Sequence, residues 1–373
     1  MKVKALQAIG INKVELTTFP KPVVEEDSIL IKNLYCGVCG TDLHGIQGKR
    51  SIRFPIIPGH ELVGVVEDIG SKALLRTRVF GGDLSIGDLV TINPRILCGK
   101  CYYCQNLPGR PEMCMGAKTY NSTIRSDEPP HLFGGWAEYI YILPGSEIIK
   151  LPTDLDPEIA ALAEPFACAI GMLDRYQKKH EYMYGDGFEI DREVVVIGAG
   201  AIGMFSISAF HLAGAGRIIA IDLIEEKLSL AKKFGATDVI NGSDTTAEER
   251  IRRVRELSDG LGASIVVESC GVPSCIGEGI QMLRRGGIFF ELGHLVKTPP
   301  AEIDPLKVCR DELEILGNYA YPSSQYLAYA AKLLKEYRLP YKKLLKSFVL
   351  EEFQDVLFSD KTKNIVKTVF KIV

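Results

Sequence analysis

The spacing of apolar and polar residues divides the chain into two parts of different character. Up to about residue 95, short alternating or β-branched stretches such as "SILIKNLYCG" and "LVGVVEDIG" are bounded by Gly, Pro and Asp. This pattern predicts short strands in a compact β-barrel-like unit. A loop rich in Cys, Pro, Gly and Tyr is expected over 98–135, and a helical pattern begins near Pro157.

The character changes at about residue 190, where "REVVVIGAGAIGMFSISAFHLAGAGRIIAIDL" joins two apolar runs through a glycine-rich turn and a helical segment. Apolar runs and helical segments continue to alternate after it, which indicates a doubly wound parallel sheet covered on both faces. The tail is expected to return to the N-terminal unit. We therefore predict an α/β protein with one domain formed by 1–165 and 310–373, and another by 166–309. The segment 180–191 is predicted to be a surface insertion.

Composition and charge narrow the class of protein. Charged residues make up 24% of the 373-residue chain, its net charge is −3, and it has no basic tail or basic amphipathic helix. Nucleic acid and membrane partners are therefore not expected. No apolar run approaches the roughly 20 residues of a membrane span, and the N-terminus has no signal-peptide core. We expect a cytoplasmic enzyme.

Cysteines crowd one short stretch of the chain. Of ten cysteines, four lie in the segment 98–114, namely Cys98, Cys101, Cys104 and Cys114. A cysteine cluster in a reducing compartment indicates metal binding rather than disulfides. Four thiolates suit a closed, tetrahedral, structural Zn²⁺ site. An iron–sulfur cluster uses similar ligands, and the spacing does not separate the two.

A glycine-rich turn, "GAGAIG" at 198–203, follows one apolar run and opens a helix. GxGxxG alone is a weak signal, but this strand–turn–helix context is the one that dinucleotide binding requires. Gly198 permits the tight turn, Gly200 lets the backbone approach a pyrophosphate, and Gly203 allows close packing of helix and strand. Ile202 is counted with them as cofactor-binding. The helix N-terminus would face the phosphates.

The next apolar run ends in an acid, Asp222, about twenty residues after the turn. Its carboxylate can accept hydrogen bonds from both ribose hydroxyls and would repel a 2′-phosphate, so NAD is favoured over NADP. No Arg follows immediately. Lys227 is placed to reach the ribose edge.

Three separate segments carry further candidate metal ligands: Cys39 in "CGTDLH", His60 and Glu61 in "GHE", and Glu164 in "ALAEPFAC". A carboxylate buried among Ala, Leu and Phe costs several kcal/mol unless a cation or donor compensates it. One Zn²⁺ bound by Cys39, His60 and Glu164 would compensate it and keep a fourth position open, which is the catalytic arrangement.

The order of these motifs resembles the zinc-dependent medium-chain alcohol dehydrogenases, over nearly the whole chain. The resemblance implies a GroES-like catalytic domain, a Rossmann NAD-binding domain and two zinc ions per chain. Glu164 with its following proline is similar to the polyol and threonine dehydrogenase branch. In that branch Glu61 or Glu164 completes the catalytic zinc site, so the choice between them stays open.

The resemblance also implies a proton relay from the substrate hydroxyl through Thr41 and the cofactor ribose to His44, and imidazole suits that final step because its pKa lies near neutral. Asp42 is expected to orient His60. Trp136, the only tryptophan, either lines the substrate pocket or packs as an ordinary large aromatic. Leu292 and His294, at the end of an apolar run, are expected beside the nicotinamide.

Together these features predict a zinc-dependent oxidoreductase that transfers hydride between a secondary alcohol or polyol and NAD, acting as a homodimer or homotetramer. The alternatives are a threonine-type dehydrogenase of amino alcohols and a zinc- and NAD-binding regulatory protein without turnover. A zinc-free reductase is disfavoured by Cys39 and His60. A zinc-ribbon module is disfavoured by the acidity and by the cysteine spacing.

Overall fold

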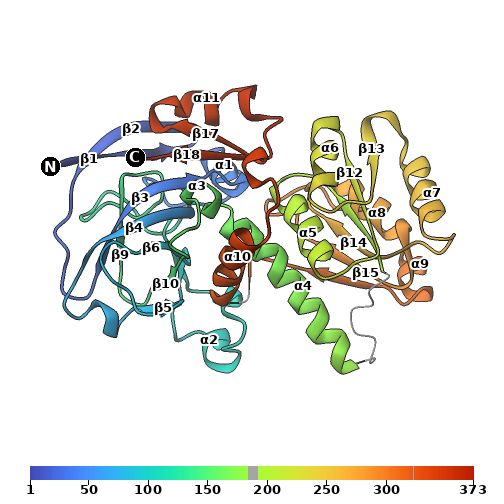
Figure 1. The fold of residues 1–373 in the computed structure, drawn as a ribbon, viewed down its shortest axis with the longest axis horizontal. Coiled ribbons are helices and arrows are strands. Elements are labelled where there is room, and N and C mark those ends of the chain that lie inside the picture. The colour runs from blue at the N-terminus through green and yellow to red at the C-terminus, as the bar shows by residue number, and fades with distance from the viewer. Residues whose placement is uncertain (184–191, 322) are drawn as a thin grey trace. The chain divides into compact units, whose positions relative to one another are not determined.

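The computed structural model describes residues 1–183, 192–321 and 323–373. The chain forms two compact units, Met1–Ala167 with Pro322–Val373 and Cys168–Tyr321, which are coloured along the chain in Figure 1. Of the predicted insertion at 180–191, residues 184–191 lie outside the described residues.

The first unit is rich in short strands, as the alternating stretches predicted. A hairpin is formed by β1 (Lys2–Gly10) and β2 (Lys13–Pro20). A larger sheet runs in the order β17, β18, β3, β4, β6, β10, β5, with β9 also paired to β3. The bounds of these strands are β3 Ile29–Gly37, β4 Glu61–Ile69, β5 Arg78–Phe80, β6 Leu89–Ile92, β9 Tyr139–Ile142, β10 Glu147–Lys150, β17 Leu345–Val349 and β18 Lys367–Lys371.

Short helices and a small ribbon complete this unit. The ribbon pairs β7 (Arg95–Ile96) with β8 (Lys118–Thr119), on either side of the cysteine-rich segment. The helices are α1 Gly40–Ile46, α2 Tyr102–Asn106, α3 Pro157–Ala160, α10 Gln325–Glu336 and α11 Phe353–Leu357. The helix α4 (Ala163–Met183) begins in this unit and continues into the second. Among the described residues, none of the helices combines the length and apolarity that crossing a bilayer demands.

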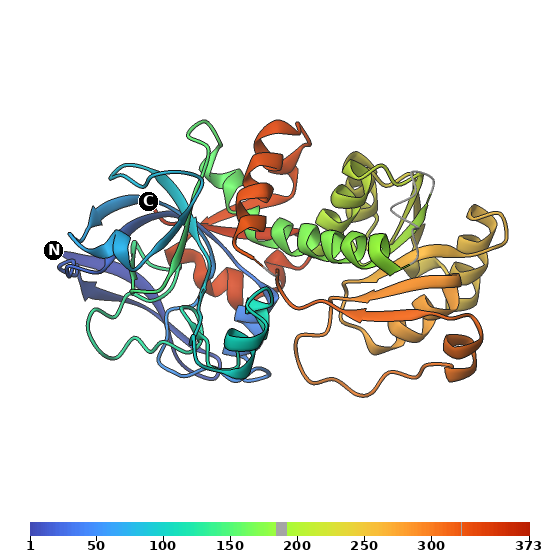
Figure 2. The same cartoon turned by 90° about the horizontal axis from the view of Figure 1, so that it is seen from below.

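The second unit is a parallel sheet in the order β13, β12, β11, β14, β15, β16. Its strands are β11 Glu193–Ile197, β12 Arg217–Asp222, β13 Asp238–Asn241, β14 Ala263–Glu268, β15 Leu283–Glu291 and β16 Glu314–Gly317. The helices are α5 Ala201–Leu212, α6 Glu225–Lys233, α7 Ala247–Leu257, α8 Pro273–Met282 and α9 Pro305–Arg310. The predicted doubly wound fold is confirmed, and Figure 2 shows helices on both sides of these strands.

Local sequence explains these elements. Every residue of β14, "ASIVVE", is buried, because helices cover both faces of the sheet and leave no polar face on the strand. The helix α7 begins with a capping box, in which Thr246 accepts from the Glu249 N–H and Glu249 accepts from the Thr246 N–H. Its apolar side then packs Val254 into the core.

The boundary after the parallel sheet differs from the predicted one. The sequence placed the return to the first unit at residue 310, whereas the structure places it at Pro322. The reason is β16, which pairs in parallel with β15. Only alternate residues of this short edge strand are shielded, so it lacks the continuous apolar run that marks the central strands.

Candidate active site

The buried carboxylate of Asp42 ties two distant segments together. The strand β3 ends at Gly37, and α1 begins at Gly40, directly after Cys39. One turn into α1, Asp42 Oδ2 accepts a hydrogen bond from the Cys39 N–H at 3.2 Å. Its Oδ1 accepts one from the Gly59 N–H at 3.4 Å. The backbones that carry Cys39 and His60 are thereby held by one side chain.

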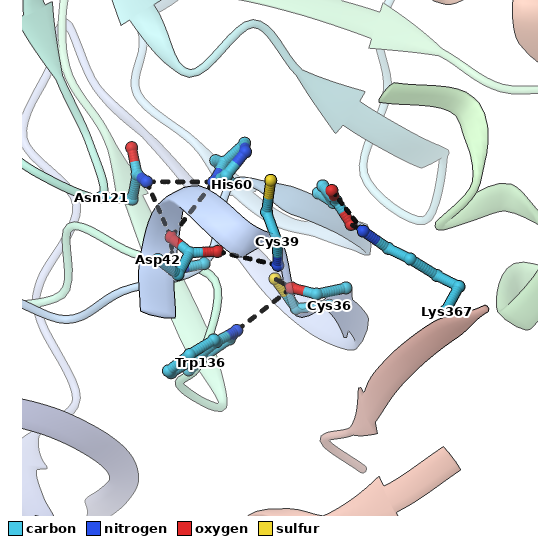
Figure 3. A network of polar contacts seen from close by, with 10 residues as sticks. Cys36, Cys39, Asp42, His60, Asn121, Trp136 and Lys367 are labelled. Carbon is cyan, nitrogen blue, oxygen red and sulfur yellow. Dashed lines mark hydrogen bonds and ion pairs between the residues drawn. The ribbon is translucent and has the colours of Figure 1, made fainter. Parts of the chain in front are cut away.

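The ring of His60 is oriented by the same carboxylate. His60 Nδ1 lies 3.3 Å from Asp42 Oδ1 and 3.0 Å from Asn121 Nδ2, and Asn121 also donates to Asp42 at 2.9 Å. Figure 3 shows these contacts. With Nδ1 engaged, Nε2 is the nitrogen left for a metal, as predicted for a ligand oriented by a neighbouring carboxylate. Burial would raise the pKa of Asp42, but His60 and its hydrogen-bond donors hold it below its ordinary value.

Glu61 and Lys367 form an ion pair inside the same site. They begin β4 and β18, the two strands that flank β3. Both are buried, with only 2% and 5% of the residue exposed, and their side chains are in direct contact. A Cβ at Gly37, the residue of β3 opposite Glu61, would collide with the Glu61 carboxylate. Because Gly37 has no side chain, the Glu61 carboxylate can occupy the space beside β3.

The charges in this site are mutually dependent. Burial opposes the protonated form of Lys367, yet Glu61 and Cys39 raise the pKa of Lys367 to about 12. Burial raises the pKa of Glu164 to about 7, with His60 and Lys367 acting in the opposite direction. One donor atom each of Cys39, His60 and Glu61 lies within 4.8 Å of the others, and Glu164 is not part of that group. Of the two candidate glutamates, Glu61 is therefore the one placed with the thiol and the imidazole.

The four clustered cysteines converge as predicted for a metal site. Their Sγ–Sγ separations are 3.9 Å for Cys98–Cys104, 3.5 Å for Cys101–Cys104, 4.0 Å for Cys101–Cys114 and 3.5 Å for Cys98–Cys114. Thiolates at about 2.3 Å from a tetrahedral zinc ion are about 3.8 Å apart. The arrangement fits a closed four-sulfur site.

The glycine-rich turn has the geometry that its sequence predicted. Gly198 has a φ of +95°, which favours glycine, and a Cβ at Gly203 would collide with the Gly198 carbonyl oxygen. Gly200 caps α5, and Ile202 lies in its first turn. Asp222, at the end of β12, accepts a hydrogen bond from the Ala199 N–H at 2.6 Å.

The other predicted dinucleotide residues lie in the same unit. Lys227 is on α6, five residues after Asp222. The Leu292 N–H donates to the Glu268 carbonyl oxygen at 3.0 Å. His294 is held by an acidic side chain, since its Nδ1 lies 2.9 Å from Glu291 Oε1. That contact was not anticipated from the sequence.

Thr41 and His44 lie three residues apart on α1, which places them on one side of the helix. Buried His44 Nδ1 has no hydrogen-bond partner among the described residues. Burial, followed by the positive charges of Lys49 and Arg50, lowers the pKa of His44 below its ordinary value. The lowered pKa favours the neutral imidazole, which is the form that can accept a proton.

Trp136 packs in the core of the first unit. Its side chain is fully buried, its Nε1–H donates to the Gly37 carbonyl oxygen at 3.2 Å, and its ring meets Phe370 edge-on at 5.2 Å. These contacts support the packing interpretation over a role in lining a substrate pocket.

Sequence reasoning missed Lys367 and Asn121. Lys367 had a signal, because a lysine interrupts the otherwise apolar or β-branched "IVKTVF" at 365–370, and a buried lysine needs an anionic partner. Asn121 stands in a polar loop stretch, "TYNSTIRSD", and had no such signal.

Known proteins share both units. Residues 25–153 match the family model of the alcohol dehydrogenase GroES-like domain, and residues 201–336 match that of the zinc-binding dehydrogenases. The chain is 31% identical to probable D-xylulose reductase A of Arthroderma otae, over 91% of this chain and 88% of that protein. It is 32% identical to L-threonine 3-dehydrogenase of Bacillus subtilis, over 81% and 79%. The crystal structure of an alcohol dehydrogenase from Thermotoga maritima has a TM-score of 0.89 and 27% identity, and covers 100% of both chains.

Substituting Trp136 tests whether this side chain packs in the core of the first unit. We expect Trp136→Phe to lower the free energy of unfolding by about 1–3 kcal/mol, because the variant loses buried volume and leaves the Gly37 carbonyl without its donor. Urea unfolding followed by far-UV circular dichroism measures this. The exposed Tyr102→Phe is the control and should change stability by less than about 0.5 kcal/mol. Equal stability of Trp136→Phe and wild type would contradict the core assignment.

Proposed function

The chain belongs to the zinc-dependent medium-chain alcohol dehydrogenase family, and from this we propose that it oxidises a secondary alcohol or polyol to a ketone with NAD as hydride acceptor. The observation that carries the proposal is the convergence of Cys39, His60 and Glu61 from two segments joined by Asp42. The names of both relatives support it, since xylulose is a ketose and threonine carries a secondary hydroxyl. A binding protein without turnover is not favoured, because those relatives are named as enzymes.

The residues of the first unit fit a catalytic zinc ion. A thiol, an imidazole and a carboxylate provide three ligands of the types found in catalytic zinc sites, with a fourth position left for substrate. Glu61 Oε1 accepts a hydrogen bond from Lys367, while buried Oε2, although within the same ion pair, accepts none. We assign Glu61 as the third ligand, oriented by Lys367. Glu164 is then a nearby carboxylate that does not bind the metal. The four clustered cysteines, Cys98, Cys101, Cys104 and Cys114, would hold a second, structural zinc ion.

When bound, the zinc ion would supply Lewis acidity toward the substrate hydroxyl and NAD would serve as the hydride acceptor. The chain's own residues position these groups and move the proton. Thr41 Oγ1 would accept the proton of the substrate hydroxyl as it gives up its own hydroxyl proton, and His44 would be the final acceptor, which becomes an imidazolium. Asp42 and Asn121 fix the His60 ring so that it presents Nε2.

The second unit would bind the dinucleotide along the glycine-rich turn. The N-terminus of α5 offers backbone N–H groups to the pyrophosphate, and Asp222 selects NAD by accepting from the ribose hydroxyls. Leu292 and His294 stay proposed neighbours of the nicotinamide.

A threonine-type amino alcohol is the second candidate substrate, because the Bacillus subtilis threonine dehydrogenase is as similar as the xylulose reductase. An NAD-reduction screen of polyols, sugars, simple alcohols and L-threonine with the metal-loaded protein tests both. Turnover of no substrate in any class, with both metals bound, would contradict the proposed function.

We also propose that the chain acts in the cytoplasm as a homodimer or homotetramer. All ten cysteines lie in the described part of the chain and none of them forms a disulfide, which suits a reducing compartment.

Two cysteine substitutions should separate the two metals. Wild-type protein is expected to contain two zinc ions per chain, and Cys39→Ser and Cys104→Ser one each, by elemental analysis. Cys39→Ser should lower kcat/KM more than about 1,000-fold, because several kcal/mol of transition-state stabilisation are lost. Cys104→Ser should mainly lower Tm. Cys309→Ser, at an exposed thiol, is the control. Normal turnover by Cys39→Ser would refute the assignment.

The two glutamates should differ in their effect on metal affinity. Glu61→Gln is expected to weaken zinc binding by roughly 10–100-fold or more in competition with a chelator, while Glu164→Gln should keep the metal. Because Glu61→Gln strands the buried Lys367 charge, Glu61→Gln/Lys367→Met is the matched variant that removes both charges. Metal loss in Glu164→Gln with retention in Glu61→Gln would reverse the assignment.

The environment of His44 predicts a pH effect. Neutral His44 is the form that accepts the proton, so alcohol oxidation should fall as pH drops through its pKa. Lys49→Gln/Arg50→Gln removes two charges that disfavour protonation, so the acid limb of kcat/KM should move to higher pH. Lys363→Gln, an exposed lysine elsewhere on this unit, should leave the profile unchanged. His44 would be excluded from the relay if the acid side of the kcat/KM profile did not shift in the double variant. The same conclusion would follow if His44→Gln kept the wild-type acid side of that profile.

A further inference from the structure

Two acidic side chains meet at the carboxyl edge of the parallel sheet. Glu268 is the last residue of β14 and Glu291 the last of β15, and the strand register pairs them directly. His294 follows three residues after Glu291. Ligands of open parallel sheets bind at this edge. These residues all belong to the second unit and share none of the ligands of the two zinc sites, while His294 is also a proposed neighbour of the nicotinamide.

One oxygen of each carboxylate is anchored by the turn that follows its strand. Glu268 Oε1 accepts from the N–H groups of Cys270 and Gly271 at 2.8 and 2.7 Å, and from the Cys270 thiol at 2.8 Å. Glu291 Oε1 accepts from the N–H groups of Gly293 and His294, each at 3.0 Å. Both side chains are therefore held in fixed orientations.

The second oxygen of each carboxylate has no such partner. Glu268 is 0% exposed, and among the described residues Glu268 Oε2, Glu291 Oε2 and His294 Nε2 are buried without a hydrogen bond. A Cβ at Gly293 would collide with Glu268 Oε2, so glycine keeps the space around that oxygen open. No lysine or arginine within the described ranges forms an ion pair with either glutamate. His294 is the basic side chain that lies beside both of them.

Two adjacent carboxylates, one of them fully buried and with only His294 as a basic neighbour, are costly unless a cation or a proton compensates them. His294 Nδ1 lies 2.9 Å from Glu291 Oε1 and 3.5 Å from Glu268 Oε2, and one donor atom of each residue lies within 4.8 Å of the others. Donors bound at about 2.1 Å to one ion are about 3.0–3.4 Å apart. A common ion would fit these separations, and it would take the place of the hydrogen bond between His294 and Glu291.

We propose that Glu268, Glu291 and His294 bind a divalent cation of the Mn²⁺ class at the carboxyl edge of the sheet. Two carboxylates balance the charge of such an ion, and one imidazole with two carboxylate oxygens suits first-row divalent metals rather than Ca²⁺. With three protein ligands, the ion keeps positions for water or an exogenous ligand. The competing occupant is a proton, since burial and the Glu268 carboxylate raise the pKa of Glu291.

The test titrates Mn²⁺ into the full-length, zinc-loaded protein without dinucleotide and follows free Mn²⁺ by electron paramagnetic resonance. We expect one Mn²⁺ per chain to bind with no release of zinc, and to raise Tm because it binds only the folded state. Glu291→Gln and Glu268→Gln should each weaken binding roughly tenfold or more. Glu302→Gln, at an exposed glutamate of the same unit, should bind as wild type does.

The outcomes are distinct. Binding that is lost in both glutamine variants and kept in Glu302→Gln supports the site. If wild type binds no Mn²⁺, or if both variants bind it as wild type does, the proposal is overturned. Absence of binding together with a higher Tm for Glu291→Gln at neutral pH would identify a shared proton instead. A Tm of each variant without Mn²⁺ shows that it is folded, and dehydrogenase activity plays no part in the readout.

Discussion

The candidate active site depends on a carboxylate that is buried and fully bonded. Asp42 accepts hydrogen bonds from the Cys39 N–H, the Gly59 N–H and Asn121, and it faces His60. An anion in this position would be costly without these donors. With them, it joins the start of α1 to the residues before β4. Cys39 and His60, two of the proposed metal ligands, lie 21 positions apart in the sequence and are thereby held in one geometry.

The same principle governs the neighbouring charges. Lys367 is buried because Glu61 lies beside it, and Glu61 reaches it because Gly37 has no side chain to block the way. The Cys39 thiolate, the Asp42 and Glu61 carboxylates, Lys367 and a divalent zinc ion would sum to zero with His60 neutral and Glu164 protonated, and burial favours the protonated form of Glu164. A site of balanced charge can be enclosed in a β-rich core at far smaller cost than an unbalanced one.

How much of this could be read from the sequence depended on the range of the interaction. The apolar runs and "GAGAIG" are local, and they predicted the parallel sheet and the turn at Gly198. The clustered cysteines were equally visible, because all four ligands lie in one short stretch. The pairing of Glu61 with Lys367 spans 306 positions and follows from the insertion of β18 beside β3. The weak alternation of β16 likewise hid the true boundary of the second unit.

Each unit contains a buried glutamate, and the two glutamates differ in the groups that lie beside them. In the first unit, Glu61 has Lys367 beside it, so a basic side chain accounts for part of its burial. In the second, Glu268 is as deeply buried, but its neighbours are backbone N–H groups, a thiol, His294 and another carboxylate. Backbone dipoles satisfy one oxygen of each glutamate and leave the other unbonded. Among the described residues no lysine or arginine pairs with either glutamate, so the positive charge that would compensate them is a bound cation, as we propose, or a proton.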